Sequence, residues 1–206
     1  MIETIMGEIN KNFLKGYFQE SAKVISSVSN EIDVIKSMAL EIYNNNKNGN
    51  KVLIGGNGGS CADAEHFAGE LLCTFKGRDR SALAAVSLSN NASAITAWAN
   101  DFDFTSYFTR QVEALGNKGD ILFLITTGGG NRENGASMNL VYAAEKAREL
   151  GLKIFTIAGK GGGILKDFSD LSITVKSNET SNIQEAHIAI LHAICFCIED
   201  LDKNGE

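Results

Sequence analysis

The chain has 206 residues, of which 44% are hydrophobic and 21% charged, with a formal net charge of −6. This composition predicts one well-buried globular domain, and the acidic balance argues against a surface built mainly to bind nucleic acid. Near the start, Glu3, Glu8 and Lys11 interrupt any signal-like apolar core, and no apolar run of about 18 residues follows, so we expect a cytoplasmic protein with no membrane partner. The four cysteines have no C-x-x-C spacing and are interpreted as buried free thiols.

The first quarter of the chain, residues 2–47, predicts two helices. Apolar residues recur there at helical spacing, and the pattern breaks near Ser29-Asn30, where Asn30 is a candidate cap for the second helix. Both helices would cover the core, and the broad apolar stripe of the first also suits packing against another subunit. We therefore treat the chain as a single domain, with residues 1–48 as a helical pair for packing and oligomerisation and residues 49–206 as an α/β core.

From residue 50 onwards, short apolar runs alternate with helical stretches. Ile121 to Ile125 are apolar at every position, as expected for a strand covered on both faces. Strands are predicted at 51–55, 83–88, 120–126, 153–158 and 171–175, and helices near 60–74, 90–98, 104–115, 133–150 and 181–202. The pattern predicts an α/β fold with a doubly wound, five-stranded parallel sheet, in which ligands bind beyond the carboxyl ends of the strands.

Two glycine-rich loops are predicted at that edge of the sheet. One follows the first strand as Gly55-Gly56-Asn57-Gly58-Gly59-Ser60, and the other follows the third strand as Thr126-Thr127-Gly128-Gly129-Gly130-Asn131. Each leads into a helix, so backbone N–H groups and the helix N-terminus favour a phosphate. Glycine is also the routine turn residue, and neither loop matches the G-x-G-x-x-G dinucleotide motif or a P-loop. The presence of two such loops is more informative than either alone.

Titratable side chains recur on two of the predicted helices. His66 and Glu70 are four residues apart and project from nearly one face, and Gln184 and His192 on the last helix border one cleft. Two imidazoles, a carboxylate and an amide oxygen form a donor set suited to zinc or a similar divalent ion. His187 falls in register with the apolar residues of the last helix, and we interpret it as a core or supporting histidine.

These motifs together resemble the sedoheptulose 7-phosphate isomerases, or phosphoheptose isomerases, of the sugar isomerase (SIS) domain superfamily. The resemblance covers nearly the whole chain and rests on Gly56–Ser60, Ala62–Leu71, Ala99–Phe102, Ile183–Ile188 and His192. It implies a flavodoxin-like SIS fold, a homotetramer with pockets between subunits, and conversion of D-sedoheptulose 7-phosphate to D-glycero-D-manno-heptose 7-phosphate. This reaction is the first step towards nucleotide-activated heptoses for lipopolysaccharide, capsule or S-layer glycans.

The resemblance also implies which residues act. One zinc per subunit would be held by His66, Glu70, Gln184 and His192. The substrate contacts would be Asn57, Gly58, Gly59, Glu70, Asn100, Asp101, Thr126, Thr127, Gly128, Asn131 and Gln184. We assign Glu70 as the base and His192 as the acid of a cis-enediol mechanism. Because zinc ligation weakens a carboxylate as a base, His66 and Asp101 remain alternative proton carriers.

Two positions depart from the family pattern. The second loop usually reads Ser-Thr-Ser-Gly-Asn-Ser, so two hydroxyl donors are missing from residues 126–131 here. A basic residue common shortly after Glu70-Leu71 is replaced by Thr74, although Lys76, Arg78 and Arg80 are close in sequence. We expect either that backbone N–H groups hold more of the phosphate or that the sugar is shifted.

Two other functions fit the same motifs. One is a non-enzymatic binding protein resembling the DnaA initiator-associating protein, and the presence of His192 favours the enzyme over it. The other is a sugar-phosphate-sensing domain, which the lack of an attached basic or DNA-binding segment disfavours.

Overall fold

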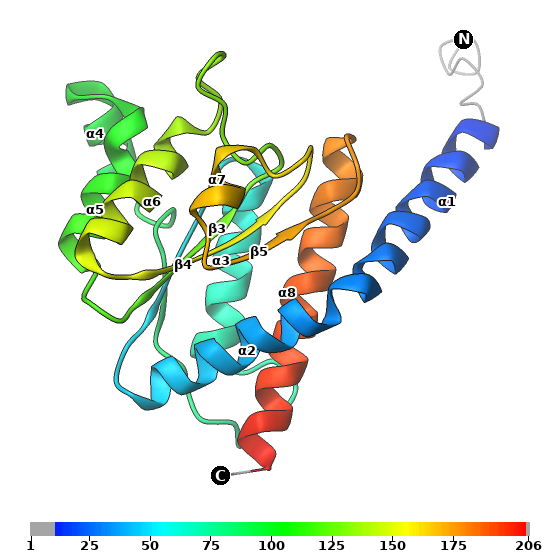
Figure 1. The fold of residues 1–206 in the computed structure, drawn as a ribbon, viewed down its shortest axis with the longest axis horizontal. Coiled ribbons are helices and arrows are strands. Elements are labelled where there is room, and N and C mark those ends of the chain that lie inside the picture. The colour runs from blue at the N-terminus through cyan, green and yellow to red at the C-terminus, as the bar shows by residue number, and fades with distance from the viewer. Residues whose placement is uncertain (1–10, 205–206) are drawn as a thin grey trace, which may run out of the picture.

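The computed structural model describes residues 11–204, beginning with a pair of helices (Figure 1). Helix α1 spans Lys11–Ser27, the 3-10 turn η1 spans Val28–Glu31, and α2 spans Ile32–Lys47. The predicted pair and its break are confirmed from Lys11 onwards, whereas residues 2–10 of the predicted first helix lie outside the described residues. The prediction of Asn30 as a cap for the second helix is wrong. Its side-chain amide donates to the carbonyl of Ser27 at 2.9 Å, so Asn30 serves the end of α1 instead.

The centre of the molecule is a parallel sheet of five strands in the order β2-β1-β3-β4-β5. The strands are β1 (Val52–Gly56), β2 (Ala85–Ser87), β3 (Ile121–Ile125), β4 (Lys153–Ala158) and β5 (Leu171–Thr174). Every residue of β1 and β3 is buried, because both strands lie inside the sheet and are covered on both faces. The predicted fold class is therefore confirmed.

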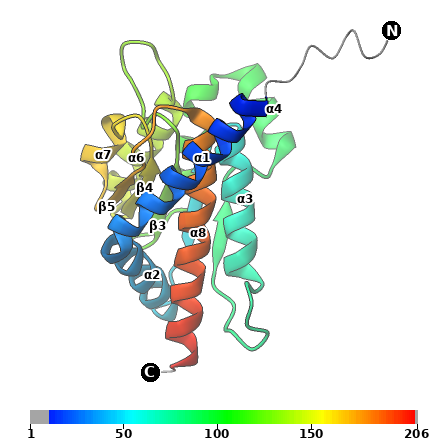
Figure 2. The same ribbon diagram turned by 90° about the vertical axis from the view of Figure 1, so that its right-hand side faces the viewer.

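Six further helices and a 3-10 turn follow α2 in the described chain. They are α3 (Gly59–Leu72), α4 (Ala92–Asp101), η2 (Phe104–Ser106), α5 (Tyr107–Leu115), α6 (Met138–Leu150), α7 (Gly163–Phe168) and α8 (Thr180–Lys203). Alternate residues along the strands face two hydrophobic clusters. Ile54 and Phe123 pack with α2, α3 and α8, whereas Leu53 and Leu122 pack with α5 and α6. The sheet is thus wound on both sides, as Figures 1 and 2 show.

Two helices differ from the sequence prediction. α6 begins at Met138 rather than near residue 133, because Gly135 and Ser137 both adopt left-handed backbone angles with φ of 73° and 54°. The Asn131 side chain also accepts hydrogen bonds from the backbone N–H groups of Glu133 and Asn134, which fixes a turn there. A short helix, α7, follows the glycines at 161–163, where no helix was predicted.

α8 is long and apolar enough to cross a membrane by length and composition alone, with a mean hydropathy of 1.2 over the relevant window. Half of that window is buried inside the fold, as in the core helix of a globular protein. Figure 2 shows α8 beside α3 with α1 crossing in front of it, and the buried residues of α8 include Ile183, Ile190 and Ile194. We therefore interpret α8 as the central packing helix of its layer.

β1 and β3 are neighbours, whereas β2 lies on the other side of β1, so the winding direction changes between β1 and β3. In open parallel sheets, ligands bind at the carboxyl ends of the strands beside such a switch point. The loops after β1 and β3 are the two glycine-rich segments, which therefore emerge side by side at that edge.

Candidate active site

α3 and α8 bring three of the predicted functional side chains together. His66 Nε2 lies 3.0 Å from Glu70 Oε1, one turn further along α3. The His66 and His192 rings meet edge to face with centroids 5.3 Å apart. The side chains of His66 and Glu70 are 45% and 21% exposed, so a ligand has access to them. Two imidazoles and a carboxylate thus share one accessible location.

Gln184 lies at the other end of the same helix pair, against the first glycine loop. A Cβ atom on Gly59 would lie 2.3 Å from Gln184 Nε2, so a side chain at position 59 would displace the end of the Gln184 side chain. Gly59 begins α3 and Gln184 lies in the first turns of α8, while His66 meets His192 two turns further on. The two helices therefore run in the same direction and border one strip of surface.

The donor set fits zinc by chemistry, since it offers imidazole nitrogens, a carboxylate and an amide oxygen. Within residues 11–204, no three His, Cys, Asp or Glu side chains already form a metal-binding cluster. His66 and Glu70 instead hydrogen bond to each other. Metal binding to both side chains would replace this contact.

The side chain of Asn57 in the first loop is held by α6. Asn57 and Asn139 exchange two amide hydrogen bonds of 2.9 Å each. Gly58 has φ of 57° and is exposed together with Gly59, so the backbone of the loop faces solvent. The loop thus presents backbone rather than crowded side chains, as phosphate binding requires.

The second loop is tightly packed at its base. Thr126 is buried, and its Oγ1 accepts the N–H groups of Gly128 and Gly129 at 3.4 and 3.2 Å. Gly129 has φ of 70°, and a Cβ atom there would lie 1.7 Å from the carbonyl oxygen of Gly162. Two of the backbone N–H groups expected to hold phosphate, those of Gly128 and Gly129, are therefore already hydrogen bonded to Thr126. In the same loop, Thr127 is half-buried and Asn131 is exposed.

Asn100 and Asp101 lie away from the histidine pair within one chain. They end α4, and the Asn100 amide donates to Asp101 Oδ1 at 2.8 Å. Both are exposed, and Figure 1 shows α4 on the far side of the molecule from α8. One chain alone does not bring them to His66 and His192.

Three residues that the sequence did not single out support the site. Phe75 stacks on His192 with ring centroids 5.4 Å apart, and Asn139 orients Asn57. Burial raises the pKa of Asp63, and the charge interaction with His66 partly offsets this rise. The Oδ2 atom of Asp63 has no hydrogen-bond partner among the described residues. Of these three residues, only Asp63 could have been identified from the sequence, because it lies three residues before His66 on the same helix face.

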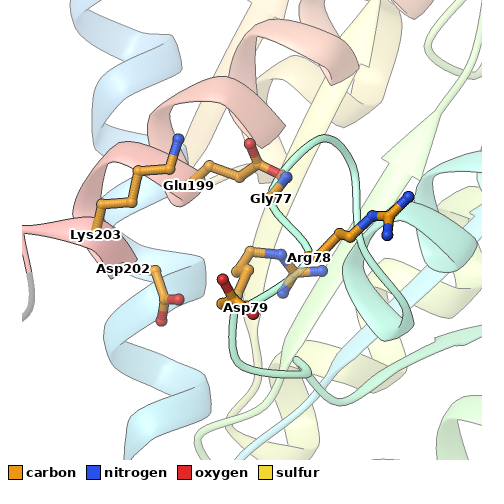
Figure 3. A pocket seen from close by; sticks show the side chains of 7 residues that line it. Gly77, Arg78, Asp79, Glu199, Asp202 and Lys203 are labelled. Atoms are coloured by element: carbon orange, nitrogen blue, oxygen red, sulfur yellow. The ribbon is translucent and has the colours of Figure 1, made fainter.

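The loop after α3 joins the two site helices around a pocket of about 300 Å³ (Figure 3). Glu199 of α8 accepts the backbone N–H groups of Lys76 and Gly77, and Figure 3 shows its carboxylate directed at Gly77. Arg80 donates to the carbonyls of Glu70 and Leu71 at 2.7 and 2.8 Å. Arg80 therefore caps α3 beside the site rather than facing a substrate.

The other two basic residues near Thr74 also have defined positions. Lys76 Nζ lies 4.2 Å from the centroid of the Phe196 ring, whereas Arg78 is exposed at the rim of the same pocket. Phe196 in turn packs edge to face on Phe75 with centroids 4.9 Å apart. Lys76 Nζ also lies 5.7 Å from the centroid of Phe75, the ring that stacks on His192.

Buried titratable groups on α8 have a structural role. His187 is fully buried, which confirms its interpretation as a core histidine, and burial lowers its pKa to about 4. Burial raises the pKa of the Cys195 thiol to about 12, which keeps it protonated and unreactive. All four cysteines are free, as predicted, but only Cys195 is buried. Cys61 and Cys197 are half-buried, and Cys73 is exposed because it lies just past the end of α3.

The chain was compared with known families and proteins. The SIS domain model matches residues 16–159. A phosphoheptose isomerase of Helicobacter pylori (strain Shi470) is 42% identical over 95% of this chain and 96% of its own length, and one of Aliarcobacter butzleri is 41% identical over 93% and 96%. The solved structure of phosphoheptose isomerase GmhA from Neisseria gonorrhoeae is 33% identical, covers 92% of this chain and 98% of its own, and superimposes with a TM-score of 0.83.

These relatives are isomerases, which favours the enzyme over the binding protein and the sensing domain. Their coverage is close to complete in both directions, so the similarity extends over the helical pair as well as the α/β core. The match of the SIS domain model and the identity with phosphoheptose isomerases over nearly the whole chain show that the chain belongs to the phosphoheptose isomerase family of SIS-domain enzymes.

Proposed function

We propose that the protein converts D-sedoheptulose 7-phosphate to D-glycero-D-manno-heptose 7-phosphate. The observation that carries this proposal is the meeting of His66, Glu70 and His192 on parallel helices that begin beside the glycine loops. Family membership supplies the substrate class, and the phosphoheptose isomerase relatives supply the seven-carbon sugar. The reaction would begin the synthesis of nucleotide-activated heptoses for surface glycans, in the cytoplasm.

The chemistry requires one group that removes a proton from C1 of the ketose and one that delivers a proton to C2. We assign the first role to the Glu70 carboxylate and the second to the His192 imidazole. The intervening cis-enediol carries developing negative charge, which nearby imidazole and backbone N–H groups stabilise. Stacking of Phe75 on His192 fixes the plane of the acid.

We further propose that one zinc per subunit is held by His66, Glu70, Gln184 and His192. When bound, the metal polarises the sugar oxygens that lie between these side chains. Because a ligating carboxylate is a weaker base, His66 and Asp101 remain candidates to share the proton transfer. Metal analysis of the purified protein tests this proposal: one zinc per chain supports it, and zinc content unchanged in His66→Ala and His192→Ala would exclude these ligands.

The substrate would lie across the carboxyl edge of the sheet. Its contacts are proposed to be Asn57, Gly58, Gly59, Glu70, Asn100, Asp101, Thr126, Thr127, Gly128, Asn131 and Gln184. Asn100 and Asp101 would reach the site from a neighbouring subunit, because one chain keeps them apart from His66 and His192. This requirement supports a homotetramer with pockets between subunits.

The first helix offers a surface for such an assembly. Leu14, Phe18 and Ile25 on α1 are 42%, 66% and 37% exposed, an unusual density of apolar side chains on one helix. Burying this surface against another copy would add a second packing partner to α1, which within the chain contacts mainly α8. Sedimentation analysis would show a tetramer, and a monomer at micromolar concentration would contradict the proposal.

Product analysis tests the function most simply. The purified protein is incubated with D-sedoheptulose 7-phosphate, with and without added zinc, and the products are identified by NMR. Formation of the aldose heptose 7-phosphate supports the proposal. Absence of any aldose under both conditions would overturn it.

A further inference from the structure

Glu185 on α8 joins the first helix of the chain to the candidate active site. Its two carboxylate oxygens accept hydrogen bonds from the Tyr17 hydroxyl and the Ser21 hydroxyl, both on α1. Tyr17 and Ser21 are four residues apart and so lie on one face of α1. Asn182 donates to the same carboxylate at 3.4 Å. Three donors from two helices thus converge on one side chain.

This contact is the main polar connection between α1 and the rest of the described chain. Among residues 12–27 only Ser21 and Val24 are buried, so α1 is held along a narrow line. Figure 2 shows α1 crossing in front of α8 at an angle. Val24, two turns along from Tyr17, continues the contact into the hydrophobic core.

The carboxylate is well satisfied as an anion. Burial raises the pKa of Glu185, but the hydrogen bonds from Ser21, Tyr17 and Asn182 together hold it below its usual range. The same carboxylate raises the pKa of the Tyr17 hydroxyl, which therefore remains a donor. Charge-assisted hydrogen bonds of this kind are roughly twice as strong as neutral ones.

Glu185 directly follows Gln184, whose side chain lies against Gly59 of the first glycine loop. Adjacent residues on a helix project about 100° apart, so one side chain faces α1 while the other faces α3. The N-cap residue of α8, Glu179, makes no side-chain hydrogen bond to the helix. The first turns of α8 are therefore held by contacts with α1 and α3, together with a 3.1 Å hydrogen bond from Lys160 Nζ to Thr180 Oγ1.

We propose that Glu185 is a positioning residue that acts through Gln184. Held by Tyr17 and Ser21, it fixes the rotation of the start of α8 and so places the Gln184 amide beside the glycine loop. Docking of α1 is thereby linked to the geometry of the substrate site. The proposal rests on the proposed function only in that Gln184 contacts the sugar phosphate.

The first test follows the start of α8 without using activity. Amide hydrogen exchange of peptides covering 180–187 is measured in the wild type, Glu185→Gln and Tyr17→Phe. Exchange should rise about tenfold in both variants, since each removes part of the clamp. Glu20→Gln is the control, because Glu20 lies on α1 but is exposed and pairs only with Lys23 among the contacts described. Unchanged exchange in Glu185→Gln and Tyr17→Phe would overturn the proposal.

The second test separates positioning from general stability. Glu185→Gln should raise KM for the ketose phosphate about tenfold, the usual cost of losing a supporting hydrogen-bond partner, with kcat changed less. In a Gln184→Ala background the same substitution should have no further effect on KM. Fully additive effects of the two substitutions would contradict action through Gln184. If the wild type fails to turn over D-sedoheptulose 7-phosphate, the proposed function fails, and the exchange measurement still decides the role of Glu185.

Discussion

The rings of His66 and His192 meet edge to face with centroids 5.3 Å apart, although they belong to the first and last helices of the α/β core. This contact exists because α3 and α8 lie side by side and run in the same direction. The loop after α3 reinforces the pairing, since Glu199 of α8 accepts two of its backbone N–H groups. The cluster of His66, Glu70 and His192 is therefore built on two helices, which favours precise placement of its side chains.

The contact between Gly59 and Gln184 predicts the effect of adding one methyl group at position 59. Gly59→Ala should raise KM by about 10- to 100-fold, because the new Cβ would displace the Gln184 amide from its place beside the loop. Steady-state kinetics with D-sedoheptulose 7-phosphate measures the effect.

Gly69→Ala is the matched control on the same helix. No atom lies within 4 Å of a Cβ at that position, so the alanine should raise the free energy of unfolding by about 0.5–1 kcal/mol through its higher helix propensity. Unchanged kinetics in Gly59→Ala would show that Gln184 does not need its observed position.

Arg80 should contribute to stability rather than to substrate binding. Arg80→Ala leaves the carbonyls of Glu70 and Leu71 without their charged donor, so the free energy of unfolding should fall by about 2 kcal/mol. Urea denaturation measures this loss. Arg78→Ala, at the exposed rim of the same pocket, should change stability by less than about 0.5 kcal/mol. Equal effects of the two substitutions would contradict the capping role.

His187 should make the protein less stable in acid. Burial lowers its pKa from 6.5 to about 4, so between these values the unfolded chain binds a proton that the folded chain does not. The contribution of His187 to the free energy of unfolding is therefore fully present above pH 6.5. It falls by up to about 3 kcal/mol as the pH drops towards 4.

The measurement is urea denaturation at pH 7.5 and pH 4.5 for the wild type and His187→Gln, which cannot titrate. The wild type should lose more stability than the variant over this interval. An identical loss in both proteins would show that His187 is not the group responsible.

The fold was predictable because its signals are local. The fully apolar run from Ile121 to Ile125 and the glycines after two strands were enough to predict a doubly wound sheet with ligand loops at one edge. The late start of α6 was not predictable, because it depends on left-handed angles at Gly135 and Ser137 that local helix propensity does not reveal. Asn30 was misassigned because its side chain serves the preceding helix rather than the following one.

The candidate site was predictable where residues share a helix face. His66 with Glu70, and Gln184 with His192, follow from helical spacing, whereas Phe75 lies in a loop whose path depends on contacts with α8. Asn139 is similar: it meets Asn57 only because α6 packs beside the first glycine loop. Such partners depend on tertiary packing, which one sequence does not specify.

The most direct test of the account is isomerisation of D-sedoheptulose 7-phosphate in D2O, with NMR of C2 in the aldose product. Proton delivery from a solvent-exchanging imidazole predicts deuterium at C2. Glu70→Gln should slow product formation by about 10²- to 10⁴-fold, while Glu149→Gln, exposed on α6, should leave it unchanged. An unlabelled product would contradict proton delivery by His192, and wild-type turnover in Glu70→Gln would contradict the role of Glu70 as the base.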